Sequence, residues 1–289
     1  MLMLERKMLI SVVLNVGITI AEIIGGILSG SLALLSDSLH NFSDAMGILA
    51  SYIALRIGKM KKNEKFTFGY RRAEILVAFL NSTILVGVSL FLIVEAYRRF
   101  SNLKPINARI MLPVATVGLF ANLISVALLH EHSHESMNVR SAYLHLLSDT
   151  LSSIAVVVGG LMLMKYGVLW IDPAITVAVS LYILREAYYI LKESIEVLME
   201  ASPNINLESI KKEIESIPGV RNAHHFHVWR VGEDEIHFEC HIATRDMMLS
   251  EAQKIIDKVE KILRKHGIKH VTIQLEVDRC EEEGIICPK

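Results

Sequence analysis

Residues 32–57 read LALLSDSLHNFSDAMGILASYIALRI, and this stretch decides the fold. It is long enough to cross a bilayer as a helix, because about 20 apolar residues span the hydrocarbon core. It nevertheless places Asp37, His40 and Asp44 inside the span. Ionisable side chains at that depth are costly, rare and usually functional. The stretch therefore predicts a membrane helix with a functional polar face.

The first two-thirds of the chain share this apolar character. The 289 residues are 52% hydrophobic with a mean hydropathy of +0.41, a surplus that a soluble core cannot absorb. The first span is interpreted as a retained helix, because its apolar run is too long for a signal peptide and contains Glu22. The pattern predicts six spans: Met8–Leu28, Leu32–Ile57, Ile75–Tyr97, Ile110–Leu129, Leu144–Met164 and Leu169–Leu191.

The composition changes at about Pro203, after which no stretch could cross a membrane. Helical periodicity and strand-like alternation follow each other in the order α-β-β-α-β, which favours two helices packed on one face of a small sheet. We expect helices at 206–216 and 250–266 and strands at 220–231, 235–243 and 271–277. The fold class is thus an all-α membrane domain of six helices over residues 1–200, and a ferredoxin-like α+β cytoplasmic domain over residues 201–289.

Basic residues near the span ends predict the orientation. The N-terminal end and the second-to-third connection carry eight lysines and arginines, and the opposite connections carry five. This bias places both termini and the soluble domain in the cytoplasm. In a bacterium or archaeon, the membrane would be the plasma membrane.

Several function classes are excluded. A net charge of −1 gives no basis for nucleic-acid binding, and three cysteines do not make a disulfide scaffold. The chain has no nucleotide-binding glycine loop. We therefore expect that the chain is not an enzyme, and that an ion gradient and not ATP would supply the energy for any transport. Gly25-Gly26 and Gly159-Gly160 lie inside spans and are interpreted as helix-packing contacts.

A second polar motif lies in the fifth span. His145-Leu-Leu-Ser-Asp149 repeats the His-x-x-x-Asp spacing of His40 and Asp44, which puts both side chains of each motif on one helix face. Two such faces would offer two imidazoles and two carboxylates to one divalent cation, and zinc suits that set. One such motif in a soluble helix would be unremarkable. Asp37 could support an imidazole, carry protons or ions, or be solvated near the mouth.

The paired motifs, the six spans and the α-β-β-α-β domain together resemble the cation diffusion facilitator family. The stretches Thr67-Phe-Gly-Tyr-Arg-Arg-Ala-Glu-Ile-Leu76 and His224-His-Phe-His-Val-Trp229 resemble its zinc-transporting branch. The resemblance implies a homodimeric antiporter that exchanges Zn²⁺ for H⁺ across the lipid bilayer. It implies two sets of metal ligands: His40, Asp44, His145 and Asp149 for transport, and His224, His241 and Glu276 in the cytoplasm.

Other polar residues leave alternatives open. Strand alternation predicts that His225 and His227 lie on one face of the sheet and His224 on the other. Gln253 and Gln274 stand where some relatives carry further ligands, and the Lys59–Tyr70 connection predicts no strong metal site. Two further groups either bind metal or are plain solvated segments: the His130–His134 loop, and Cys280 with Cys287.

Other functions use the same residues. A metal-gated passive channel would need the intramembrane ligands alone. A membrane-anchored metal sensor would need only the cytoplasmic histidines. Within the transporter class, the cation could be cadmium, cobalt, nickel, iron or manganese in place of zinc, although the mixed nitrogen and oxygen donors favour zinc.

Overall fold

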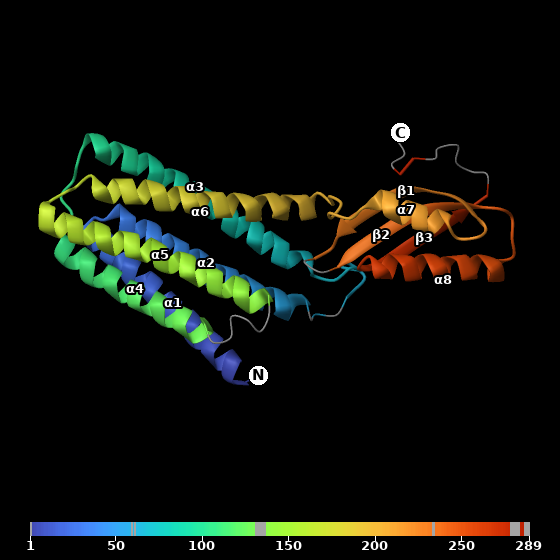
Figure 1. Cartoon of the computed structure of the whole chain (residues 1–289), viewed down its shortest axis with the longest axis horizontal. Helices are drawn as coiled ribbons and strands as arrows, with labels where there is room; N and C mark the ends of the chain where they lie inside the picture. Colours follow the sequence, from blue (N-terminus) through green and yellow to red (C-terminus); the bar gives the residue numbers. More distant parts are fainter. Residues whose placement is uncertain are drawn as a thin grey trace. The chain divides into compact units, whose positions relative to one another are not determined.

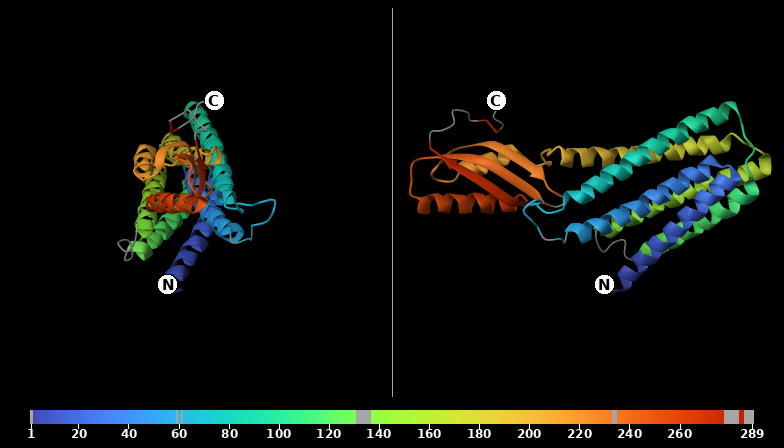
Figure 2. Two further views of the ribbon diagram at one scale, coloured as in Figure 1. Left: turned by 90° about the vertical axis from the view of Figure 1, so that its right-hand side faces the viewer. Right: turned by 180° about the vertical axis from the view of Figure 1, so that it is seen from behind.

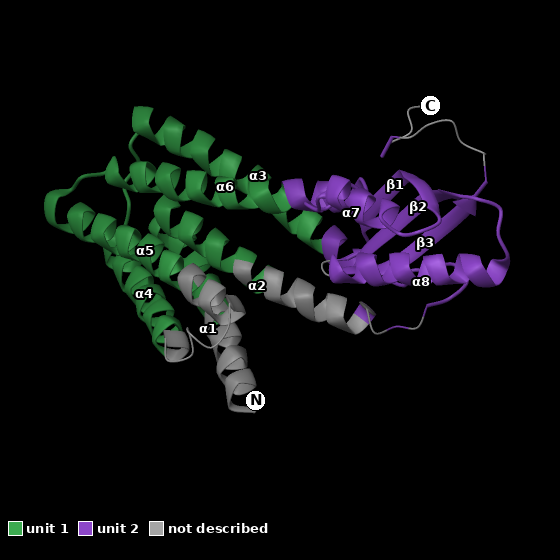
Figure 3. Cartoon of the chain, turned by 45° about the vertical axis from the view of Figure 1, so that its right-hand side comes forward, with its two compact units in different colours: residues 1–53, 77–191 green, residues 54–76, 192–289 purple. Residues whose placement is uncertain are grey.

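The fold was examined in a computed structural model of the chain. It describes residues 2–58, 60, 62–130, 137–232, 235–277 and 284–285. Side chains are described for residues 16–43, 45–46, 57, 60, 62–127, 146–232, 235–277 and 284–285. Contacts fall into two compact units, one of residues 1–53 and 77–191 and one of residues 54–76 and 192–289 (Figure 3).

Every predicted span corresponds to a helix (Figure 1). In the part with described side chains, four helical segments are long and apolar enough to cross a membrane: Arg72–Ser101, Ala108–Ala127, Leu146–Tyr166 and Ile171–Leu198. Their large apolar side chains point outward as well as inward, as lipid contact requires, since Phe91 and Leu151 are more than 60% exposed. The helices are α1 Leu2–Ser29, α2 Leu32–Gly58, α3 Arg72–Ser101, α4 Ala108–His130, α5 Met137–Tyr166 and α6 Ile171–Leu198.

Small residues bring these helices close together. A Cβ on Gly25 would lie 2.8 Å from a Val114 methyl group, so α1 and α4 touch at this glycine. On α5, a Cβ on Gly159 would lie 2.3 Å from Ile175 of α6. The helix-packing interpretation of the intramembrane glycines is therefore confirmed. A buried apolar cluster joins α2, α4 and α5, and another joins α3 to α6. Figures 1 and 2 show the course of these helices.

The second unit contains the predicted small domain, in the predicted order. Its elements are α7 Leu207–Glu215, β1 Val220–Arg230, β2 Ile236–Thr244, α8 Leu249–Lys265 and β3 Ile268–Glu276. The sheet order is β1-β2-β3, with β1 antiparallel and β3 parallel to β2. Strand β3 begins three residues earlier than predicted, at Ile268, which directly follows the left-handed Gly267 (φ +82°).

One apolar core holds this domain together. The amphipathic helices α7 and α8 place Ile210, Ile214, Val259 and Leu263 against one face of the sheet, and all four are fully buried. Asn206 caps α7 by accepting a hydrogen bond from the Ser209 N–H at 3.0 Å. The opposite face of the sheet carries the histidines.

Candidate metal centres

Helices α2 and α5 bring one residue of each His-x-x-x-Asp motif into contact. His40 Nε2 lies 2.6 Å from Asp149 Oδ1, although 109 residues separate the two in the chain. Both side chains are buried. Asp44 and His145 lie one helical turn along the same helices, but their side chains are outside the described ones. The structure thus brings together His40 and Asp149, and the four-ligand set remains a prediction.

Helix α6 adds an aromatic neighbour that the motif search missed. The Tyr182 ring meets the His40 imidazole edge-on, with 5.7 Å between centroids, and the Tyr182 hydroxyl is 2.7 Å from Ser148 Oγ of α5. This contact restricts the orientation of the imidazole. A tyrosine in an apolar span has no distinguishing spacing, so the sequence offered no signal for Tyr182.

Asp37 is buried and hydrogen-bonded. Its two carboxylate oxygens accept hydrogen bonds from Ser152 and Ser153 of α5, at 2.7 and 2.8 Å. Asn122 of α4 in turn donates to Ser153 at 3.0 Å. The interpretation of Asp37 as a solvated residue near the mouth is therefore wrong, because α5 supplies a polar patch that encloses the carboxylate.

Glu22 of α1 also faces the bundle interior. Its Oε2 accepts a hydrogen bond at 2.8 Å from Asn41, the residue that follows His40 on α2. Both side chains are almost completely buried. The interior between α1, α2, α4 and α5 therefore carries further buried polar groups besides the His40–Asp149 contact.

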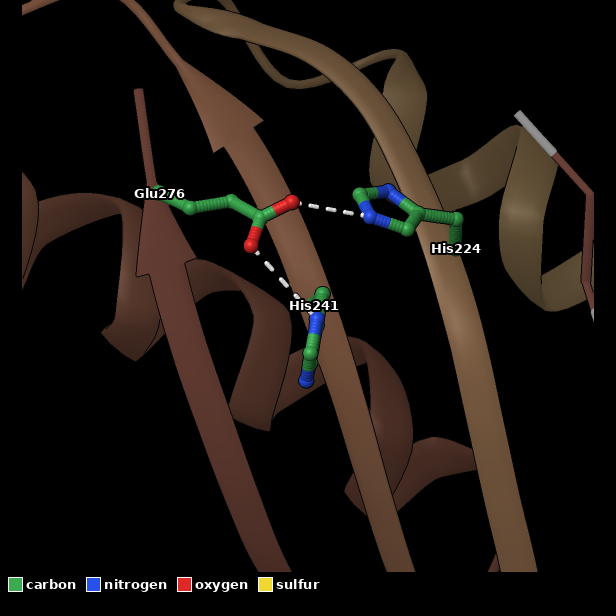
Figure 4. A group of neighbouring side chains, drawn as sticks. All are labelled: His224, His241 and Glu276. Atoms are coloured by element: carbon green, nitrogen blue, oxygen red, sulfur yellow. Dashed lines mark ion pairs between the residues drawn. The ribbon is translucent and has the colours of Figure 1, made fainter. Parts of the chain in front are cut away.

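The cytoplasmic candidates also come together. His224 of β1, His241 of β2 and Glu276 of β3 each offer a ligand atom, and these atoms all lie within 4.8 Å of one another. Glu276 reaches His224 Nε2 at 2.9 Å and His241 Nδ1 at 3.5 Å (Figure 4). In the described part of the chain, this is the one group of three such residues with metal-binding geometry.

A β-bulge decides which histidines share this face. From His224 to His227, β1 advances three residues while β2 advances two, from His241 to Glu239. As a result, Ala223 and Phe226 both point into the core, and all three histidines of β1 lie on the opposite face. The prediction that His224 lies on the other face from His225 and His227 was wrong, because simple alternation ignores the extra residue.

The bulge has its own supports. His225 has a positive φ of 55°, which non-glycine residues seldom adopt. Its ring stacks on that of His241, with centroids 4.5 Å apart, and it meets the His227 ring at 4.7 Å. Gly284 and Ile285 accept hydrogen bonds from the His225 and Phe226 N–H groups, at 3.4 and 2.7 Å.

The donor set fits a divalent cation. His224 Nε2 and Glu276 Oε1 are buried and lie 2.9 Å apart, yet neither atom has a hydrogen-bond partner among the described residues. Burial lowers the pKa of His241, and Glu276 acts in the opposite direction. A neutral imidazole is the metal-binding form. Two imidazoles and one carboxylate suit zinc and leave a coordination position open.

Other candidate residues have different roles or lie outside the described part. Gln253 donates to Asp257 on its own helix at 2.9 Å, and Gln274 is exposed opposite His241. Cys240 is buried in the core, and that burial raises its pKa to about 12. Cys280, Cys287 and residues 131–136 lie outside the described residues, as does the side chain of His130.

The second-to-third connection is organised by a turn. Asn63 Oδ1 accepts hydrogen bonds from the N–H groups of Lys65 and Phe66 at 3.0 and 2.8 Å, and its Nδ2 donates to Tyr70 at 3.0 Å. Its polar atoms are thus committed to the local fold. That the connection holds no strong metal site stays a prediction.

The fold and the two side-chain clusters define a class: a helical membrane protein with an attached α+β domain and candidate metal ligands in both parts. Comparison with family models narrows this class. Residues 8–199 match the cation efflux transmembrane domain, and residues 202–278 match the cytoplasmic domain of cation efflux proteins. The chain therefore belongs to the cation efflux family and is a transporter.

Individual relatives agree over nearly the whole chain. The cadmium, cobalt and zinc/H(+)-K(+) antiporter of Bacillus subtilis is 36% identical over 98% of this chain and 93% of that protein. The zinc transporter ZitB of Escherichia coli is 35% identical over 95% of this chain and 88% of that protein. The metal cation efflux system protein CzcD of Cupriavidus metallidurans is 35% identical over 96% and 88%.

Proposed function

We propose that this chain is a homodimeric antiporter that exports zinc from the cytoplasm in exchange for protons. Residues 1–200 would form the transport domain, and residues 201–289 the cytoplasmic metal-binding and dimerisation domain. The observation that best supports this proposal is the 2.6 Å contact between His40 and Asp149, which is buried between two membrane helices. The named activities of the relatives support metal transport, and the antiporter name of one supports proton exchange.

The exchange follows from the protonation chemistry of the ligands. Imidazole binds metal only when neutral, and carboxylate only when ionised, so metal and protons compete for the same atoms. Histidine has a reference pKa of about 6.5 and changes charge within the physiological range. A site formed by His40, Asp44, His145 and Asp149 would take zinc from the cytoplasm and exchange it for protons when open to the other side.

The cytoplasmic centre would have a separate role. His224, His241 and Glu276 belong to the small domain, and one of the two family models describes that domain in cation efflux proteins. Metal held there would cross-link all three strands at one face of the sheet. We expect this to stabilise the domain without placing the metal on the transport path.

The test is transport into sealed proteoliposomes with a pH-sensitive dye inside. In vesicles with an imposed acidic interior, zinc entry should make the lumen more alkaline, because protons leave as zinc enters. A protonophore should stop the accumulation of zinc against its concentration gradient. Replacing Asp149 with Asn should remove both signals. Zinc entry that continues unchanged without proton movement would identify the competing function, a metal-gated passive channel. Parallel runs with cadmium, cobalt and manganese, each with and without potassium, rank the cations.

A further inference from the structure

A single buried carboxylate joins α6 to the start of α2. Asp172, in the first turn of α6, is 1% exposed. It accepts hydrogen bonds from Ser31 Oγ at 2.5 Å, from the Leu32 N–H at 3.0 Å and from the Ala33 N–H at 3.2 Å. The first N–H groups of a helix have no intrahelical acceptor, and a negative charge is favourable there. Asp172 therefore caps a helix that begins 140 residues earlier in the chain.

Helix α3 joins the same contact through Arg99. The guanidinium lies 4.0 Å from Asp172 and donates a hydrogen bond to the Gly30 carbonyl. Gly30 has a φ of +74°, which glycine adopts without steric cost, and it makes the tight turn between α1 and α2. We call Gly30, Ser31, Arg99 and Asp172 the capping junction. It ties the α1–α2 turn, the end of α3 and the start of α6 together.

Apolar packing continues from the junction toward the metal ligands. Leu32, Leu92 and Ala96 form a buried cluster between α2 and α3, and Leu35 and Leu39 extend it along α2. Ser36 of α2 and Ser180 of α6 are also buried, with their hydroxyl oxygens 3.1 Å apart. His40 follows Leu39 directly and lies about 12 Å along the helix from Leu32. Closely packed side chains therefore separate His40 from this end of the helices.

We propose that Asp172 is a positioning residue that keeps the non-cytoplasmic end of the membrane domain closed and separates from α2 when that end opens. The inference rests on the proposed transport function, in which the site opens first to one side of the membrane and then to the other. Transporters make this change largely by rocking one group of helices against another. Release on the outer side requires α2 to move away from α3 and α6. A carboxylate that stays buried after losing its hydrogen-bond donors raises the free energy of the protein. Intermediate arrangements are therefore unfavourable, and the junction favours two discrete states, one joined and one separated.

The test measures which end is open, independently of transport. Ser36→Cys places a thiol on α2 one turn beyond the junction. A membrane-impermeant maleimide is added outside right-side-out vesicles that contain the full chain. We expect slow labelling in the Ser36→Cys parent, and labelling about tenfold faster after Asp172→Asn, because an amide loses the charge and one acceptor oxygen.

Matched variants separate positioning from general damage. Thr176→Val alters a buried hydroxyl in the same turn of α6, which donates to the Asp172 carbonyl at 2.8 Å and not to α2. This variant should label as slowly as the parent, and Asp172→Glu should restore part of the protection. The chain without Ser36→Cys should not label, because its native cysteines lie in the cytoplasmic domain under the proposed orientation. A disulfide between Ser36→Cys and Ser180→Cys should stop metal release.

Equal labelling rates in Asp172→Asn and Thr176→Val would overturn the proposal. If Asp172→Asn does not reach the membrane, Ser31→Ala and Arg99→Gln weaken the same junction, and at least one must accelerate labelling for the proposal to stand. If the Ser36→Cys parent protein transports no metal, the proposed function is refuted. The labelling comparison would still decide whether Asp172 keeps the non-cytoplasmic end of the membrane domain closed.

Discussion

The two candidate metal centres are built on different secondary structure, and they differ in how the sequence reveals them. In the membrane domain, one spacing on each of two helices places His40 and Asp149 on facing surfaces. In the cytoplasmic domain, His224, His241 and Glu276 come from three strands, and their meeting depends on register. A helix keeps the same face for any i, i+4 pair, whereas one extra residue in a strand changes every face that follows.

The largest expected effect falls on the membrane centre. Asp149→Ala should reduce zinc uptake into proteoliposomes by about 100-fold, because the remaining ligands are left with an incomplete set in a low-dielectric interior. Ser152→Ala is the matched control, because Ser152 lies on the same helix as Asp149 but donates its hydrogen bond to Asp37 of α2. This variant should reduce zinc uptake only a few-fold. Equal losses in both variants would mean that packing of α5, and not ligation, explains the result.

The next prediction separates the two centres from each other. Glu276→Ala should weaken zinc binding at the cytoplasmic centre by about 10- to 100-fold, with uptake at saturating zinc kept within a few-fold. Thr272→Ala changes an exposed residue on the same face of β3, opposite Glu239 and not opposite a ligand, and should leave both quantities unchanged. Equilibrium zinc binding and uptake are measured on the same full-length preparations. Complete loss of uptake in Glu276→Ala would show that the two centres are not independent.

A smaller effect tests the bulge that aligns the strands. His225→Val should lower the stability of the protein by about 1–2 kcal/mol relative to His225→Asn, because asparagine tolerates a positive φ and valine does not. Both variants lose the ring that stacks on His241, so only the backbone preference differs between them. Thermal unfolding of the detergent-solubilised chain gives the difference. Identical midpoints would argue against the positive φ at this position.

The smallest expected effect concerns a histidine outside both centres. Burial, nearby His270 and the Lys62, Arg71 and Arg72 cations lower the pKa of His237, and Glu235 lies 3.2 Å from its Nε2. The Trp229 ring lies 5.5 Å from the His237 ring, so its fluorescence in a Trp170→Phe background should report this titration. We expect a midpoint below about 6.5 that disappears in His237→Gln.

The same shift predicts the direction of the stability change. Because the folded chain holds His237 neutral, the unfolded chain binds its proton at higher pH. Stability should therefore fall as the pH drops from about 6.5 to the lowered pKa, and then level off. His237→Gln should flatten that part of the profile. A profile of equal slope in the variant would assign the pH dependence to other groups.

The elements themselves were predictable because their signals are local. Apolar runs of about 20 residues, strand alternation and the Gly267 stop each act over a few residues, so all six membrane helices and the α-β-β-α-β order were recovered. The residues that surround the two candidate metal centres were not predictable in this way. Tyr182 and the two serines that bind Asp37 come from other helices, and their identity depends on how those helices pack.

The amino-acid sequence alone determined the membrane class, the helix faces and the repeat of the His-x-x-x-Asp spacing in two spans, because hydropathy and helical periodicity are properties of short segments. Only the tertiary structure decided that His224 shares a face with His225, that Asp37 is enclosed by serines, and that Asp172 caps α2. Each of these depends on contacts between residues distant in the chain, and such contacts form only when the helices and strands pack.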